Sequence, residues 1–119
     1  AGVPTDYYWE TPSSINHTYG YGKGDTDWRS WEELADLLVR CVSHNGNYLL
    51  NIGPKGDGSI PEESITSMRA IGEWLKVNGE AIYGTTASPF EPPEIIATLP
   101  CSFMSRVILF TLCRRHVSR

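Results

Sequence analysis

Apolar residues recur at helical spacing in two stretches of the chain, on either side of a short and nearly continuous apolar run. Steps of three and four residues are typical of an amphipathic helix that buries one face. The spacing predicts helices over residues 31–44 and 62–77. The two apolar stripes consist of Trp31, Leu34, Leu37, Leu38, Cys41 and Val42, and of Ile65, Met68, Ile71, Gly72 and Leu75.

Polar residues at the expected ends of both helices support these boundaries. Ser30 and Glu33 have the spacing of a capping box, in which each side chain bonds the backbone N–H of the other residue. The Asn45–Gly46 pair supplies the left-handed residue that commonly follows a helix. Pro61 suits the first position of the second helix, and the Asn78–Gly79 pair is expected to end it.

The apolar run between the helices, residues 47–52, predicts a strand. Such a run is typical of a strand covered on both faces, so we expect almost complete burial. Helix, strand and helix in this order indicate an α/β fold. Asn51 is the polar exception, and its amide needs hydrogen-bond partners. The carboxyl end of such a strand faces the ligand site in parallel α/β proteins; alternatively, Asn51 only fixes the following loop.

The rest of the chain is less regular. Residues 1–29 mix glycine and proline with aromatic residues, which predicts a long loop with a short strand at residues 6–9. We expect a short extended piece at residues 81–83 and a further strand at residues 107–112. Several prolines after residue 88 indicate a boundary, which divides the chain into residues 1–88, one domain, and residues 89–119, a linker and atypical tail.

Composition limits the possible functions. The 119 residues are enough for one ordinary domain. A net charge of −4 argues against a nucleic-acid-binding protein. The chain has no apolar run of about eighteen residues, so no membrane span is predicted. Ala1 begins neither a signal peptide nor a chain with an initiating methionine, and we therefore expect an internal piece of a longer protein.

Glu10 is the carboxylate that the expected helices do not explain. Most other acidic residues lie where they cap a helix or face solvent. Glu10 follows Trp9 in the aromatic loop, and a carboxyl group beside an apolar ring favours its protonated form because burial penalises the charge. This would suit a general acid. The alternative, an ordinary surface residue, stays open at this point.

Four other patterns give weaker indications of function. Residues 53–59 superficially suggest a phosphate loop, but they lack the Gly-Lys-Ser/Thr ending, and Pro54 removes an N–H donor. Asp25 and Asp27 could touch calcium but are too few for a site. The histidines and cysteines have no metal-ligand spacing, so no metal is predicted. Residues 16–18 fit the N-glycosylation sequon, which matters only in a secreted eukaryotic protein.

Several uncommon motifs nevertheless occur in order between about residues 7 and 90. They are Trp9-Glu10-Thr11, Ser14-Ile15-Asn16, Tyr19-Gly20-Tyr21, the stretch from Leu34 to Leu38, Asn45-Gly46-Asn47-Tyr48-Leu49-Leu50-Asn51-Ile52-Gly53-Pro54, Asp57-Gly58, Ile60-Pro61, Ile71-Gly72-Glu73-Trp74-Leu75 and Asn78-Gly79-Glu80-Ala81-Ile82-Tyr83-Gly84-Thr85. Together they closely resemble the α-L-fucosidases of glycoside hydrolase family twenty-nine. The resemblance ends near Phe90, and residues 94–119 depart from the family pattern.

The resemblance implies a partial (β/α)₈ TIM-like barrel, of which this chain holds the carboxyl-terminal strands and helices. It implies hydrolysis of terminal α-L-fucose from glycans with retention of configuration, without a cofactor, by a secreted, periplasmic or lysosomal enzyme. Retaining glycosidases use two carboxyl groups about 5 Å apart. By resemblance Glu10 is the candidate acid/base and Trp9 a candidate wall of the sugar site, while the nucleophile and the fucose-binding histidines are absent from this chain. We therefore expect the isolated chain to be inactive.

Two further classes of function remain as alternatives. In the first, the chain is a non-catalytic carbohydrate-binding module whose aromatic loop stacks on sugars. In the second, it is a scaffold formed by part of a barrel. An aspartate-bearing strand and a histidine pair upstream of this chain would discriminate the enzyme from both.

Overall fold

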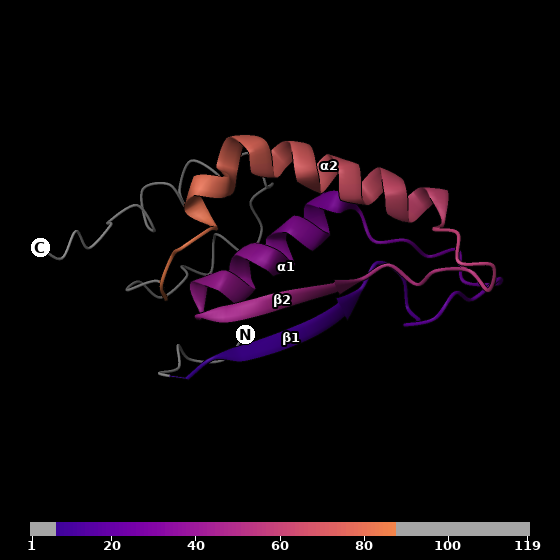
Figure 1. Cartoon of the computed structure of the whole chain (residues 1–119), viewed down its shortest axis with the longest axis horizontal. Helices are drawn as coiled ribbons and strands as arrows, with labels where there is room; N and C mark the ends of the chain where they lie inside the picture. Colours follow the sequence, from indigo (N-terminus) through magenta and orange to yellow (C-terminus); the bar gives the residue numbers. More distant parts are fainter. Residues whose placement is uncertain (1–6, 88–119) are drawn as a thin grey trace, which may run out of the picture.

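A computed structural model describes residues 7–87 of the chain. The elements follow in the order β1 (Trp9–Ser14), α1 (Trp31–Ser43), β2 (Gly46–Asn51), α2 (Glu62–Asn78) and the short 3-10 helix η1 (Gly79–Ala81). The two strands lie side by side, α1 lies over them, and α2 lies outermost, beyond α1 (Figure 1). Strand, helix, strand and helix therefore alternate, and the described part of the chain has the α/β fold that the sequence predicts.

Both helices and the strand between them are confirmed within one residue at most boundaries. Ser30 is the N-cap of α1, and the capping box with Glu33 is complete. Asn45 has a φ of 62°, the left-handed conformation expected after α1. Pro61 is the N-cap of α2 rather than its first helical residue. α2 ends at Asn78 as expected, but the chain continues into η1 because the next residue keeps helical backbone angles.

The strand expected at residues 6–9 lies instead at Trp9–Ser14, so this prediction was wrong in position. β1 pairs with β2 in parallel, with Trp9 opposite Gly46 and Ser14 opposite Asn51. Pro12 and few apolar residues weaken the strand signal in the sequence of β1. This segment is a strand because it pairs with β2. Local residue propensities do not predict such a pairing between distant segments.

Two apolar clusters join the layers. One combines Ile15, Leu34 of α1 and Ile71 of α2, with Leu50 of β2 packed against it. The other, at the opposite end of α1, centres on Val39 and includes residues around η1. Leu34 is fully buried, and Cys41 is only 3% exposed, which confirms its predicted core position. The helices thus cover one face of the two-stranded sheet.

The expected burial of β2 on both faces was wrong for the described residues. Exposure alternates along the strand, and the side chain of Leu49 is 49% exposed. The physical reason is that α1 covers one face only, so every second side chain points to the uncovered face. We call this uncovered surface of β1 and β2 the open face.

The remaining expectations concern the segments around these elements. Residues 81–83 are not the extended piece that the sequence predicts, because Ala81 ends η1 and Ile82 follows with helical backbone angles. The strand expected at residues 107–112 and the tail 89–119 lie outside the described residues. Among residues 7–87, no helix is long and apolar enough to cross a membrane.

Candidate functional site

The carboxyl ends of β1 and β2 meet, and two loops leave the sheet there. The last residues of the strands, Ser14 and Asn51, are opposite each other. The backbone N–H of Ile15 then donates to the Asn51 carbonyl oxygen at 3.3 Å. In parallel α/β proteins ligands bind at this edge, so we take it as the candidate functional site.

Asn51 has the partner that its position requires. Its Nδ2 donates a hydrogen bond of 2.5 Å to the main-chain oxygen of Tyr19, 32 residues earlier in the chain. The side chain therefore ties the end of β2 to the loop that follows β1. This agrees with the expectation that a polar amide at the strand end is hydrogen-bonded, and it also agrees with the alternative that Asn51 fixes a loop.

A compact hydrogen-bond network shapes the start of that loop. The Ser14 hydroxyl contacts the main-chain oxygen of Thr18 at 2.7 Å and the Asn16 side-chain oxygen at 3.0 Å. The Thr18 hydroxyl contacts the main-chain oxygen of Gly20 at 2.7 Å. Asn16 is only 5% exposed, so the folded loop does not present the sequon asparagine to solvent. Sequence reasoning missed this turn, although the close spacing of its short polar residues was a signal for it.

Acidic residues hold the outer part of the same loop. The Asp25 carboxylate accepts from the backbone N–H of His17 at 3.0 Å, and the Asp27 carboxylate contacts His17 Nε2 at 2.6 Å. Both are internal contacts of an exposed loop. Among the described residues no group of three or more acidic, histidine or cysteine side chains could hold a metal ion.

The loop after β2 contributes a tight turn. The Asp57 carboxylate accepts from the hydroxyl and the backbone N–H of Ser59, and these hydrogen bonds lower the pKa of Asp57. Lys55 places its Nζ 5.7 Å from the centroid of the Tyr21 ring. The turn is therefore fixed by its own polar groups and touches the loop after β1.

Trp9 and Glu10 point to opposite sides of β1, as neighbours in a strand must. The Trp9 ring lies on the side of α1, where its Nε1 donates to the main-chain oxygen of His44 at 2.9 Å. Glu10 is exposed on the open face, opposite Asn47 in β2. The burial of Glu10 beside an aromatic ring, which the sequence suggested, is not what the described residues show.

Glu10 also lies near the amino end of its strand, four residues before Ser14. A strand rises about 3.3 Å per residue, so Glu10 is roughly 13 Å from the carboxyl edge. The candidate residues thus fall into two groups: Asn51 belongs to the carboxyl edge, and Trp9 and Glu10 belong to the amino half of the sheet.

Two titratable groups lie between the sheet and α1, Cys41 buried and Tyr48 half-buried. Burial raises the pKa of the Cys41 thiol, while the backbone N–H of Thr11 lowers it and the charge of Glu10 raises it. Burial also raises the pKa of the Tyr48 phenol, opposed by the neighbouring Ser13 hydroxyl and the charge of Arg29. Both groups stay neutral near pH 7 and act as packing residues.

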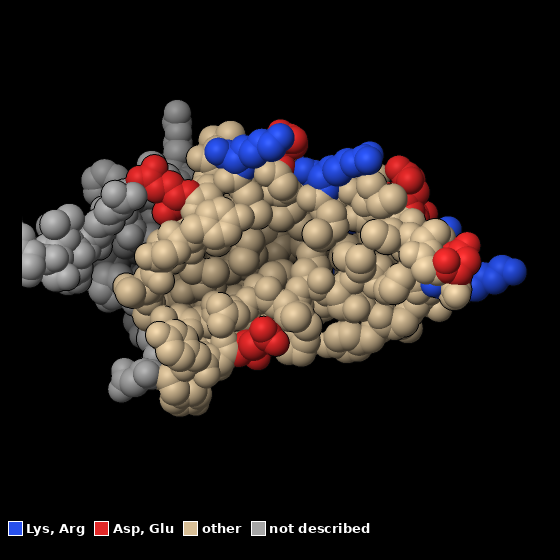
Figure 2. Space-filling model, viewed as in Figure 1, with Lys and Arg blue, Asp and Glu red and all other residues tan. Residues whose placement is uncertain are grey.

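A cavity of about 370 Å³ lies at the amino end of β2, away from the candidate site. Its lining includes Leu38, Val42, Asn45, Tyr48, Ile82 and Tyr83. Over the middle of the face seen in Figure 2 the surface is largely uncharged, and charged side chains of both signs lie along the edge formed by α2 and at the end where the loops lie.

Comparison with known proteins identifies the family. The sequence model of the family "Alpha-L-fucosidase" matches residues 2–80. Human plasma alpha-L-fucosidase is 46% identical over 80 residues, which are 65% of this chain and 17% of that protein. The alpha-L-fucosidase of Dictyostelium discoideum is 39% identical over 80 residues, 66% of this chain and 17% of its own length. The chain thus spans less than a fifth of these curated relatives.

Solved structures agree with the sequence match. The Thermotoga maritima alpha-fucosidase in complex with fucose has a TM-score of 0.69 at 42% identity, over 72% of this chain and 20% of that chain. A second structure is a trapped covalent intermediate of a family twenty-nine α-L-fucosidase from Bacteroides thetaiotaomicron, obtained with a glutamate-to-glutamine mutant. Its TM-score is 0.69 at 32% identity, over 74% of this chain and 21% of that chain. The chain belongs to the α-L-fucosidase family, glycoside hydrolase family twenty-nine.

Proposed function

We propose that this chain forms part of a retaining α-L-fucosidase that hydrolyses terminal α-L-fucose from glycans. The observation that carries the proposal is the family match over residues 2–80, in a chain whose described elements overlay fucosidase structures. One of those structures is a complex with fucose. The relatives are named as fucosidases, which supports an enzyme over a non-catalytic carbohydrate-binding module.

The proposed fold is the carboxyl-terminal part of a (β/α)₈ barrel. Two parallel strands, each followed by a helix on the same side, are the repeating unit of such a barrel. In a closed barrel the open face, which includes the half-exposed Leu49, would form part of the packed interior. This accounts for an apolar side chain that no described element covers.

Retention of configuration is proposed because a covalent intermediate has been trapped in the Bacteroides relative. A retaining glycosidase forms a glycosyl-enzyme through one carboxylate and hydrolyses it with the help of a second. Glu10 is the single carboxylate in β1 and β2. The Trp9-Glu10 motif matches the motif whose glutamate serves as acid/base in some family members, so we propose that role for Glu10.

The geometry also supports a competing role for both residues of this motif. Catalytic side chains of barrel enzymes come from the carboxyl ends of the strands, and residues near the amino ends serve stability. Glu10 lies in the amino half of β1, and Trp9 is bound to His44 on the helix side. In the structural role, Glu10 would be a polar residue of the barrel interior that takes no part in proton transfer. Trp9 would hold α1 to the sheet and would not line the sugar site.

The proposed location is outside the cytosol: secreted, periplasmic or lysosomal. The human relative is named a plasma enzyme, which supports this location. The proposal concerns the whole enzyme. Retention of a tagged full-length protein in the cytosol would contradict it.

The test of function uses a chimaeric enzyme, in which residues 7–87 of this chain replace the matching segment of the Thermotoga maritima relative. The expected result is release of the chromophore from an aryl α-L-fucoside, and none from the matching β-fucoside. A second chimaera in the human plasma relative controls for misfolding in one host. Folded chimaeras without turnover, judged by circular dichroism, would contradict the proposal.

A further inference from the structure

Three contacts join the loop after β1 to the loop after β2 at the candidate site. Asn51 Nδ2 donates to the main-chain oxygen of Tyr19 at 2.5 Å. Gly53 packs on the same carbonyl, since a Cβ built on it would lie 3.5 Å from the Tyr19 oxygen. Lys55 Nζ lies 5.7 Å from the centre of the Tyr21 ring. We call these contacts the loop clasp.

Of the three, the Asn51 hydrogen bond holds the loop most firmly. Asn51 is half-buried at the end of β2, and its backbone carbonyl also accepts from Ile15. One residue therefore fixes the beginning of the loop through its main chain and the Tyr19 position through its side chain. The Lys55 contact is weaker, because the Tyr21 ring is exposed and a cation near a ring at the surface contributes about 0.5–1 kcal/mol.

Gly53 allows the two loops to approach each other because of its backbone conformation. Its φ of 52° is left-handed, a conformation that costs a residue with a Cβ about 1 kcal/mol or more. A Cβ at this position would make only ordinary contacts with Tyr19 and Gly20. The left-handed φ angle, and not a lack of space, is therefore the reason for glycine at this position. The turn at Gly53 brings the loop after β2 into contact with the Tyr19 main chain.

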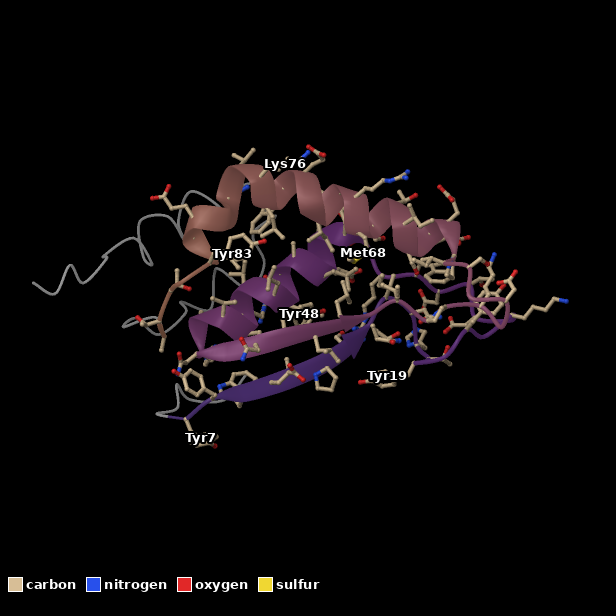
Figure 3. All side chains as sticks on the ribbon, viewed as in Figure 1. Tyr7, Tyr19, Tyr48, Met68, Lys76 and Tyr83 are labelled. Carbon is tan, nitrogen blue, oxygen red and sulfur yellow. The ribbon has the colours of Figure 1, made fainter. Side chains whose placement is uncertain are left out.

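The clasp sets the direction of an exposed aromatic ring. The Tyr19 side chain is 58% exposed. In Figure 3 it lies beyond the carboxyl ends of the strands, on the side away from both helices. This is the side onto which the open face looks. An aromatic ring offers a flat apolar surface for the C–H face of a saccharide, and its hydroxyl offers a hydrogen bond.

We propose that Asn51 is a positioning residue that, through the Tyr19 carbonyl, holds the Tyr19 ring against the saccharide bound at the carboxyl edge of the sheet. The proposal rests on the fucosidase function proposed above for the saccharide, while the hydrogen bond itself stands on the structure alone. It gives the Asn51 side chain a role in sugar affinity, with no part in proton transfer.

The test compares Asn51→Ala with a matched control. Asn78→Ala removes the same kind of bond, from Nδ2 to the main-chain oxygen of Trp74 at 2.9 Å, at the far end of α2. Amide hydrogen exchange is measured by mass spectrometry in the chimaeric enzyme. Asn51→Ala should speed exchange of residues 17–21 about three- to tenfold, the effect of losing one hydrogen bond, and Asn78→Ala should leave that segment unchanged.

The kinetic arm separates positioning from structure. Asn51→Ala should raise KM for an aryl fucoside about three- to tenfold with little change in kcat, as expected for loss of uniform binding. Asn51→Gln keeps an amide donor and should recover part of the loss. Asn51→Asp places a carboxylate against the Tyr19 carbonyl and should not recover it. Tyr19→Ala should raise KM at least as much as Asn51→Ala. The double variant that carries both substitutions should have a KM close to that of Tyr19→Ala alone.

Each outcome decides a separate claim. Unchanged exchange at residues 17–21 in Asn51→Ala would overturn the clasp even if the chimaera is a working fucosidase. Faster exchange with an unchanged KM would overturn the role in sugar affinity. A wild-type chimaera that folds but turns over no fucoside would contradict the proposed function, and the exchange result would still decide whether Asn51 holds the loop.

Discussion

The indole nitrogen of Trp9 donates a 2.9 Å hydrogen bond to the main-chain oxygen of His44, so the first residue of β1 is bonded to the C-cap residue of α1. The same ring covers Gly46, the first residue of β2. A Cβ built on Gly46 would lie 2.5 Å from Cζ2 of Trp9. These contacts hold the amino ends of both strands to the helix.

Gly46→Ala should therefore destabilise the chimaeric enzyme. The added methyl group forces the Trp9 ring or the strand to move, and overpacking of this kind costs about 1–3 kcal/mol. Gly72→Ala is the control, because it adds a methyl group inside α2 where nothing lies within 4 Å. It should stabilise by up to about 1 kcal/mol. The measurement is the midpoint of urea unfolding, and a neutral Gly46→Ala would contradict the described position of the ring.

The isolated 119-residue chain should hydrolyse no aryl α-L-fucoside. A retaining glycosidase needs two carboxyl groups about 5 Å apart, and β1 and β2 together supply one, Glu10. Removing one member of the pair removes a step that water does not easily replace. Measurable turnover by purified chain, absent from a mock purification, would mean that a second carboxylate completes a site within it.

The isolated chain should also be poorly stable. Leu49 on the open face is 49% exposed and Val77 of α2 is 80% exposed, and the free edges of a two-stranded sheet leave backbone groups unpaired. We expect a broad thermal transition by circular dichroism and binding of a dye that reports exposed apolar surface. A sharp, cooperative transition from a monomer would show an autonomous domain instead.

Sequence patterns predicted the parts of this fold that depend on local interactions. The helices were recoverable because their stripes and caps, such as the Ser30–Glu33 box, lie within a few residues of each other. β1 was misplaced because Trp9–Ser14 is a strand only through its pairing with β2. The burial of β2 was overestimated because an apolar run does not reveal which layers cover it.

The candidate site was predicted in part. The need of Asn51 for a hydrogen-bond partner followed from its place in the strand, but the identity of that partner, the Tyr19 carbonyl, depends on a contact across 32 residues. The opposite directions of Trp9 and Glu10 follow from strand geometry once β1 is known. They could not be inferred while this segment was interpreted as a loop.

The two roles proposed for Glu10 lead to different kinetics in the chimaeric enzyme. As acid/base, Glu10→Gln should lower turnover about 10²–10⁴-fold for poor leaving groups. The first step should fall much less for an aryl fucoside whose phenol leaves without protonation. The second step then limits the rate, and azide, which needs no base, should restore it and give α-L-fucosyl azide with retained configuration.

A structural Glu10 gives another result. The loss would then be similar for all leaving groups, azide would rescue nothing, and the unfolding midpoint would fall in parallel. Glu80→Gln serves as the control, because Glu80 is an exposed residue of η1, remote from the open face. It should leave the leaving-group dependence unchanged. The azide product therefore decides between the two roles.

The most direct test of the account is the configuration of the first sugar released. An aryl α-L-fucoside is hydrolysed by the chimaeric enzyme in an NMR tube, and the anomeric proton is followed before mutarotation. A retaining fucosidase passes through a covalent intermediate and must release α-L-fucose first, which then converts slowly to the β anomer. Initial appearance of β-L-fucose, or release of no fucose by a folded chimaera, would contradict the proposed function.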